Sequence, residues 1–249
     1  MELFDTHVHL YEPPLAADPD GVLARAAAAG VTRLVVPAYD AASWEATLAA
    51  SAHPGVFPAL GLHPWVADQP LDLGALRVAL VERRAVAVGE VGLDAKTGPD
   101  LAVQRERLRG QLALACDLDL PAILHCRGAF EELLALLREF APRLRGVVHA
   151  FARGPELLER FLGLGLQVAF GGAATRPGSR AARSVPLVPP DRLLLETDAP
   201  SIGLHGLPAH EVEPWHVRKV AEAVAGLRGT TVDEVAATTT TNARALFRV

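Results

Sequence analysis

The chain has 249 residues, half of them hydrophobic, and a formal net charge of −5 at neutral pH. This length can bury one sizeable core, and no linker-like, repetitive or low-complexity stretch divides it, so we expect a single domain over residues 1–249. The acidic balance excludes a protein that holds nucleic acid across a broad basic surface, but it allows an enzyme that uses a few local cations.

Cysteine usage and hydropathy indicate the compartment. The two cysteines, Cys116 and Cys126, offer neither a disulfide framework nor the spacing of metal ligands. Cys126 follows His125 in an apolar run, so we expect its side chain to face away from His125 as a packed free thiol. No signal peptide or membrane helix is recognisable. We therefore expect a cytoplasmic protein without a membrane partner; the oligomeric state stays open, and a monomer is compatible with the sequence.

The first predicted element is an apolar run over residues 3–10 that contains Asp5, His7 and His9. Side chains alternate between the two faces of a β-strand, so we expect these three to point toward one spot. Two imidazoles and a carboxylate suit a divalent metal ion. The alternative is a set of polar residues at a strand end that binds no metal.

Seven further apolar, β-rich runs follow and alternate with helix-compatible stretches. Several are continuous in Val, Leu and Ala, as expected for parallel strands buried on both faces. Eight such strands, in a chain close to the typical ~250 residues, predict a (β/α)₈ TIM barrel, with an open doubly wound sheet as the alternative. The predicted strands are residues 3–10, 33–39, 56–61, 85–92, 122–126, 146–150, 166–170 and 192–196.

Three helix signals support this alternation. Apolar residues at helical spacing predict a helix over residues 101–118. Gly154 and Pro155 resemble an N-cap followed by a first-turn proline. Thr231 and Glu234 form the sequence pattern of a capping box for a late helix.

Polar residues recur where six of the predicted strands end. In a TIM barrel the chemistry lies at the C-terminal ends of the strands. Each residue alone has a structural explanation, such as a core histidine, an aspartate that starts a turn or a carboxylate in a salt bridge. Charged and imidazole groups are costly to bury singly, so their recurrence at one end predicts a functional site. The strand-end residues are His7, His9, His63, Glu90, Asp94, His125, Arg127, His149, Glu196 and Asp198.

The segments that carry these residues resemble the TatD-type metal-dependent hydrolases, a branch of the amidohydrolase-like barrels. They occur in the order of the family and spread over nearly the whole chain. The matching segments are DTHVHL at 5–10, GLHP at 61–64, GEVGLD at 89–94, HCR at 125–127, HAF at 149–151, ETDAP at 196–200 and TNARALF at 241–247.

The resemblance implies a centre of two divalent metal ions. It assigns His7, His9 and Asp198 to one metal. It assigns His125 and His149 to the other metal, and Glu90 to both as a bridge. No strand-end lysine is available for carboxylation, so a glutamate bridge is chemically sensible. Imidazole and carboxylate ligands suit zinc, manganese or magnesium and do not select among them.

The expected activity is hydrolysis of DNA phosphodiester bonds, by a deoxyribonuclease that uses a water activated by two metals. The resemblance makes Asp198 the group that takes the proton from the attacking water, with Glu90 as the catalytic bridge. Arg127 offers a planar fork for a phosphate. His63 is expected to contact a phosphate or the leaving group, and Arg153 adds positive charge near the substrate.

Two other functions remain open from the sequence. The same barrel chemistry allows hydrolysis of an amide, ester or lactone in a small molecule. A metal-binding interaction protein without turnover is the second possibility, although a complete ligand set beside Asp198 speaks against it. The arginines of the loop 176–183 are either part of the substrate site or a solvated surface.

Overall fold

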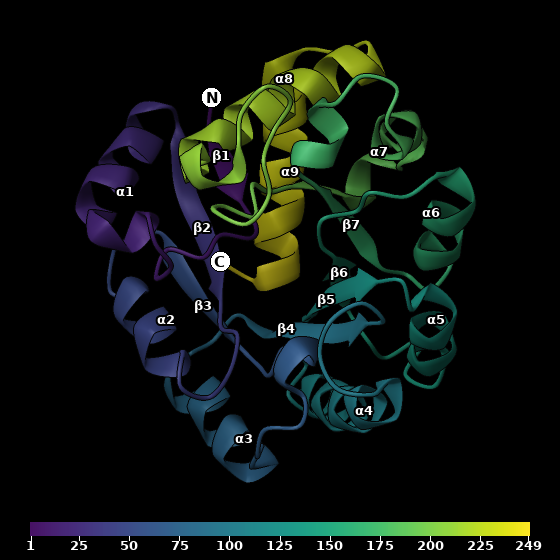
Figure 1. Cartoon of the computed structure of the whole chain (residues 1–249). Helices are drawn as coiled ribbons and strands as arrows, with labels where there is room; N and C mark the ends of the chain where they lie inside the picture. The colour runs from purple at the N-terminus through teal and green to yellow at the C-terminus, as the bar shows by residue number, and fades with distance from the viewer.

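Eight parallel strands form one sheet in sequence order, β1 to β8, in the computed structural model, which describes all 249 residues. All α-helices except the last lie around the outside of this barrel (Figure 1). The sheet confirms the predicted TIM barrel. Its strands are β1 Leu3–Asp5, β2 Val31–Pro37, β3 Val56–Leu60, β4 Ala87–Asp94, β5 Ala122–Arg127, β6 Gly146–Val148, β7 Gln167–Phe170 and β8 Leu193–Leu195.

Helices follow the strands, and two α-helices follow β8. None of them combines the length and the hydrophobicity that crossing a membrane would require. The α-helices are α1 Pro19–Ala28, α2 Trp44–Ala50, α3 Leu73–Glu82, α4 Leu101–Asp117, α5 Phe130–Arg138, α6 Pro155–Leu162, α7 Arg180–Ser184, α8 Val217–Arg228 and α9 Val232–Phe247. Short 3₁₀ helices are η1 Leu15–Ala17, η2 Pro64–Val66, η3 Gly172–Thr175, η4 Val185–Leu187, η5 Pro190–Arg192, η6 Ala209–Glu211 and η7 Pro214–His216.

The predicted helix signals are confirmed. The helix expected over residues 101–118 is α4. Gly154 is the N-cap of α6, and a proline follows at its first position. The hydroxyl of Thr231 accepts a hydrogen bond from the backbone N–H of Glu234, and the Glu234 carboxylate accepts one from the N–H of Thr231, which completes the capping box of α9.

The barrel closes through backbone that follows β1 and β8, because no strand pairing joins these two strands. The N–H of Asp198 donates to the carbonyl oxygen of His7 (2.9 Å), and the N–H of His9 donates to that of Ala199 (2.8 Å). The predicted strand over 3–10 therefore ends earlier than expected, at Asp5. The segment that closes the barrel is also the segment that carries His7, His9 and Asp198.

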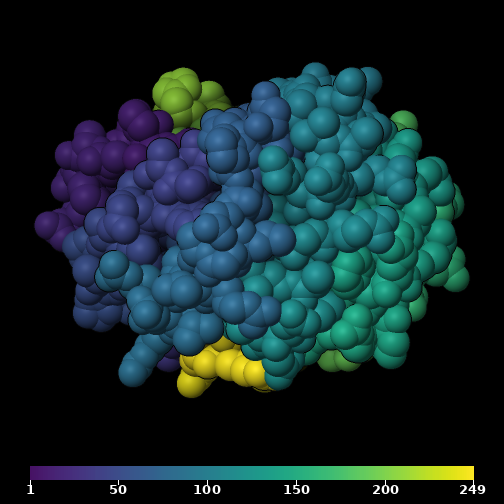
Figure 2. Space-filling view, turned by 90° about the horizontal axis from the view of Figure 1, so that it is seen from below, coloured from purple at the N-terminus to yellow at the C-terminus, as the bar shows by residue number.

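Helix α9 covers the N-terminal end of the barrel. Its residues Ala243, Leu246 and Phe247 are buried in one cluster with inward-facing strand residues that include Phe4 and Ile123. Figure 1 shows α9 across the middle of the barrel, and Figure 2 shows the yellow C-terminal segment and the lime segment between β8 and α8 at opposite edges of the molecule. Because α9 fills one end, only the other end of the barrel is available for a site.

Two buried glutamines of α4 form hydrogen bonds with the backbone beside that open end. The side chain of Gln111 accepts from the N–H of Leu62 (2.7 Å) and donates to its carbonyl oxygen (3.1 Å). Gln104 makes the same pair of contacts with the backbone of Asp94, at 2.8 and 2.9 Å. These side chains hold the ends of β3 and β4 where the site residues follow. From the sequence pattern of an amphipathic helix, such polar residues would be expected on the solvent-exposed face.

Replacing Gln111 with leucine should lower the free energy of unfolding by about 2–4 kcal/mol, because a buried N–H and a buried carbonyl of Leu62 lose their partner together. Urea denaturation would measure this. The control is Gln69→Leu, since Gln69 is exposed and its replacement should change stability by less than about 0.5 kcal/mol. Equal losses in the two variants would show that the Gln111 hydrogen bonds contribute no stability.

Candidate metal centre

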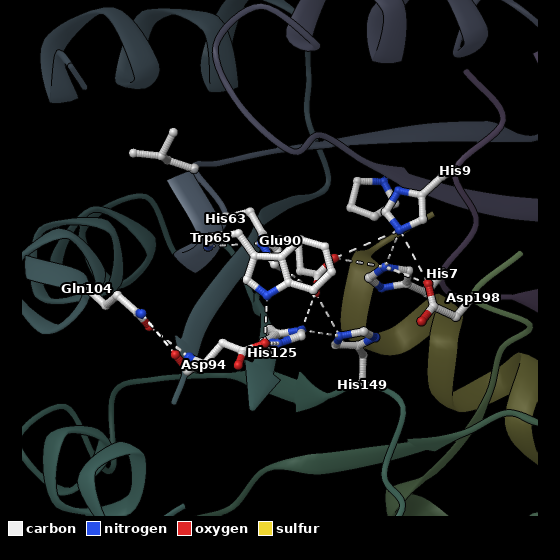
Figure 3. A network of polar contacts seen from close by, with 12 residues as sticks. His7, His9, His63, Trp65, Glu90, Asp94, Gln104, His125, His149 and Asp198 are labelled. Atoms are coloured by element: carbon white, nitrogen blue, oxygen red, sulfur yellow. Dashed lines mark hydrogen bonds and ion pairs between the residues drawn. The ribbon is translucent and has the colours of Figure 1, made fainter. Parts of the chain in front are cut away.

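All six predicted metal ligands lie together at the C-terminal end of the barrel (Figure 3). A cavity of about 670 Å³ opens above them. Five of the six side chains line it directly, and His7 lies below them, fully buried. The strand ends thus bring together residues that the sequence spreads from position 7 to position 198. The lining of the cavity includes His9, Tyr39, His63, Trp65, Glu90, His125, Arg127, Phe130, His149, Arg153 and Asp198.

Glu90 lies at the centre of this group (Figure 3). One carboxylate oxygen, Oε2, lies 3.2 Å from Nε2 of His7. The other, Oε1, lies 2.8 Å from Nδ1 of His125 and 2.8 Å from Nε2 of His149. His63 approaches the same Oε1 with its Nε2 at 3.2 Å. The two oxygens of Glu90 therefore face two different sets of imidazoles.

The first set consists of His7, His9 and Asp198. The Nε2 atoms of the two histidines are 3.3 Å apart, and Oδ1 of Asp198 lies 3.3 Å from Nε2 of His9. Their ligand atoms all lie within 4.8 Å of one another, and the three residues are buried. Two imidazole nitrogens and a carboxylate oxygen facing one another fit the donor set of a divalent cation.

The second set contains His125, His149 and also His63. Nδ1 of His125 lies 3.3 Å from Nε2 of His149. The ligand atoms of His63, Glu90 and His125 lie within 4.8 Å of one another. The imidazole nitrogens and the carboxylate oxygen of this second set also suit a divalent cation. The sequence predicts that His63 contacts a phosphate or the leaving group, and His63 lines the cavity. Its Nε2 points to Glu90 and its Nδ1 accepts from the N–H of Trp65.

Charge couples Glu90 to His149. Burial alone would raise the pKa of Glu90, but the nearby imidazoles of His149, His63 and His7 hold that pKa well below its ordinary value. Burial alone would lower the pKa of His149, but the carboxylates of Glu90 and Glu196 raise it well above the ordinary histidine value. Glu90 is therefore ionised at neutral pH, as a metal ligand must be.

Two carboxylates lie behind the histidines. Oδ2 of Asp94 accepts from Nε2 of His125 (3.1 Å) and from the indole N–H of Trp65 (2.6 Å). Burial alone would raise the pKa of Asp94, but these hydrogen bonds lower it. Glu196 lies 3.7 Å from Nδ1 of His149, too far for a hydrogen bond. A carboxylate that accepts from the second ring nitrogen, as Asp94 does, fixes the orientation of a metal-binding imidazole. Asp94 and Glu196 were both recognised from the sequence as strand-end residues, but the sequence assigned no role to either.

A sequence model described as TatD related DNase matches residues 4–248. The chain belongs to this family. It is 39% identical, over 98% of its length and 97% of the relative's, to a protein of Escherichia coli (strain K12) named uncharacterized metal-dependent hydrolase YjjV. It is 36% identical to a protein of Erwinia amylovora named 3'-5' ssDNA/RNA exonuclease TatD, over 98% and 99% of the two lengths.

A solved structure agrees with this assignment. The crystal structure of the TatD homologue YjjV from Escherichia coli superposes with a TM-score of 0.92 at 38% identity and covers 99% of this chain and 98% of the other. A hydrolase of the TatD family from Entamoeba histolytica has the same fold, with a TM-score of 0.88. The protein is thus a TatD-type metal-dependent hydrolase, as the sequence motifs predicted.

One expectation about the first motif is wrong in this TatD-family protein. Asp5 does not point toward the imidazoles of His7 and His9, although its Oδ1 accepts from the backbone N–H of His7 (3.2 Å). Its carboxyl group accepts from the hydroxyl of Thr197 (2.6 Å) and from the N–H of Thr197 (2.9 Å), away from the cavity. Alternation holds only within a strand, and β1 ends at Asp5. Full burial raises the pKa of Asp5 to about 8, against the opposing effect of the hydrogen bonds from Thr197.

The predicted substrate-binding arginines lie on the wall of the cavity. Arg127 ends β5 and is exposed. The guanidinium of Arg153 lies 4.5 Å from the centroid of the Phe130 ring. Their role in substrate binding stays a prediction, as does that of His63.

Cys126 is a free thiol that packs against the core, and burial raises its pKa to about 12.

Proposed function

We propose that this TatD-family protein is a deoxyribonuclease that hydrolyses phosphodiester bonds of DNA with two divalent metal ions. The observation that carries the proposal is the cavity of about 670 Å³, which has carboxylates and imidazoles at its floor and arginines on its wall. The names of relatives such as the Erwinia amylovora exonuclease support a nucleic-acid substrate. Since those names include RNA, the experiment below separates DNA from RNA.

The metal ions, zinc, manganese or magnesium, would supply positive charge that acidifies a water and neutralises charge developing on phosphate oxygens. We assign one of them to His7, His9 and Asp198, and the other to His125 and His149. The two oxygens of Glu90 face both sets, which supports a bridging role. The ligands of this proposal are therefore His7, His9, Glu90, His125, His149 and Asp198.

Asp198 is the proposed proton acceptor. Burial alone would raise its pKa, but the hydrogen bond with His9 and the charges of the nearby imidazoles lower it. The carboxylate is therefore ionised at neutral pH and ready to take the proton of an attacking water. It also lines the cavity, so a substrate phosphate can approach it.

The walls of the cavity match the two parts of a nucleotide. Arg127 and Arg153 lie on the β5 and β6 side and present guanidinium groups suited to phosphate oxygens. Tyr39 and Trp65, which follow β2 and β3, also line the cavity, and 38% of Trp65 is exposed. Aromatic faces of this kind stack on bases without sequence preference. We infer that His63, which stacks on Tyr39 at 5.0 Å, keeps this wall in place beside the leaving group.

Cleavage of end-labelled oligonucleotides by the metal-loaded protein tests the proposal. Single-stranded DNA, double-stranded DNA and single-stranded RNA should be compared, together with a panel of small esters, lactones and amides. We expect shortened DNA products. Turnover of a small ester or lactone without cleavage of any oligonucleotide would overturn the proposal in favour of a small-molecule hydrolase. No turnover of any substrate at full metal loading would favour a binding protein.

Arg127→Ala should weaken binding and turnover of DNA by about 1–3 kcal/mol, because one charge-assisted contact to phosphate is lost. Metal content should not change, since Arg127 touches none of the proposed ligands. Steady-state kinetics and elemental analysis would measure the two quantities. Arg105→Ala is the matched control, because Arg105 lies exposed on α4, away from the cavity. A parent rate in Arg127→Ala would remove Arg127 from the site.

A further inference from the structure

A second cavity, of about 360 Å³, lies beside the metal centre. It is formed by the start of α5, the segment before α6, the face of α6 and the start of α7, which Figure 1 shows along one side of the barrel. Five of its nine lining residues are charged, four arginines against one glutamate. The arginines are Arg153, Arg160, Arg180 and Arg183, and the glutamate is Glu156.

Three of these arginines have no carboxylate partner. Arg160 pairs with Glu131 of α5. Arg183 donates only to the carbonyl oxygen of Gly178 (2.9 Å), and Arg153 lies on the ring of Phe130. Arg180 is exposed at the first position of α7 and makes no side-chain hydrogen bond or ion pair. In a chain with a net charge of −5, this cavity is a local concentration of unneutralised positive charge.

The two cavities adjoin each other. Phe130 and Arg153 line both of them. The Phe130 ring holds the guanidinium of Arg153 at the boundary, 4.5 Å from the ring centroid. A chain of phosphates with one diester at the metal centre can therefore continue past Arg153 toward Arg180 and Arg183.

We propose that this arginine cavity binds a second phosphodiester of the same single strand, next to the one that is hydrolysed. This inference rests on the proposed nuclease function and adds a position to its substrate. Guanidinium groups bind phosphate oxygens as a planar fork and carry their charge at every physiological pH. A small ester or lactone has no second anionic group that would use this cavity. The site therefore selects for oligonucleotides over dinucleotides.

The experiment compares a dinucleotide with an octanucleotide of DNA, using Arg180→Ala, Arg180→Lys and the control Arg138→Ala. Arg138 is exposed at the end of α5, outside the cavity. Arg180→Ala should fold normally, because an exposed helical arginine is replaced by the best helix former. The readouts are KM and kcat for each substrate and the binding of fluorescent octanucleotide to metal-free protein by anisotropy.

Arg180→Ala should raise the octanucleotide KM about five-fold and reduce the slope of log affinity against log salt by about 0.7, the value for one phosphate of a single strand. The KM of the dinucleotide, the kcat values and the behaviour of Arg138→Ala should not change. Arg180→Lys should keep the salt slope of the parent, since the charge is retained, but should lose part of the affinity, because an ammonium group cannot form the planar fork.

The outcomes separate the two proposals. Cleavage of both substrates with the same octanucleotide KM in parent and Arg180→Ala would overturn the phosphate site and keep the nuclease function. Octanucleotide binding that depends on Arg180, without cleavage, would keep the site and overturn the nuclease function. Absence of both cleavage and Arg180-dependent binding would overturn both.

Discussion

Glu90→Gln should reduce hydrolysis by about 10²–10³-fold, the usual loss when a group that stabilises charge in the transition state is removed. The amide keeps the shape of the side chain but loses the charge that faces both sets of imidazoles, with Oε2 toward His7 and Oε1 toward His125 and His149. Metal content should fall at both positions. Elemental analysis, thermal denaturation and kinetics on the same preparation would measure this.

The matched control for this change is Glu106→Gln, because Glu106 is exposed on α4 and makes no ion pair. It should behave like the parent protein. If Glu90 were only a partner in a buried ion pair, Glu90→Gln would lower the melting temperature and leave metal content intact. Normal metal content with normal activity would exclude the bridging role altogether.

Asp198→Asn should abolish most activity, by about 10²–10⁴-fold, because the amide cannot accept the proton of the attacking water. One metal contact would also weaken, since Oδ1 of Asp198 faces Nε2 of His9 at 3.3 Å. The two effects separate in a metal titration. Excess metal should restore occupancy without restoring activity.

Asp68→Asn is the control, because Asp68 is exposed and makes no side-chain contact. Full recovery of Asp198→Asn in excess metal would show that Asp198 is a ligand and not the proton acceptor. Recovery of metal content and activity to the same partial degree would point to the same conclusion.

The grouping of the site residues at one end of the barrel could be predicted from the sequence, because the strand pattern alone tells which residues lie near the C-terminal ends of the strands. Glu90 lies within β4, His125 lies near the end of β5 and His149 follows β6, so their convergence at one end of the barrel needed no knowledge of side-chain packing. Asp5 shows the limit of this reasoning. Its expected direction assumed a strand over residues 3–10, whereas hydrogen bonding to the residues after β8 ends the strand at Asp5.

Residues that act through another side chain could not be predicted in the same way. Asp94 contacts His125 and Trp65, from three separate segments, and sequence spacing does not encode such a meeting. Gln104 and Gln111 are polar residues of an amphipathic helix, a pattern that indicates exposure. Their burial depends on hydrogen bonds to the backbone of Leu62, which follows β3, and of Asp94, at the end of β4. Recognising them requires the three-dimensional structure.

The barrel closes at a seam, where the backbone after β1 hydrogen-bonds to the backbone after β8. This closure implies an order in which the parts of the site come together. Asp5 and Thr197, which meet across the seam, are 192 positions apart in the chain. A nascent chain therefore displays His7 and His9 long before Asp198 has been synthesised, and the proposed ligand set is complete only when the last strand docks on the first. Contacts of such long range form late in folding, because the loop between them must close first. The metal-to-protein ratio of a preparation should accordingly report the fraction of molecules in which the barrel has closed.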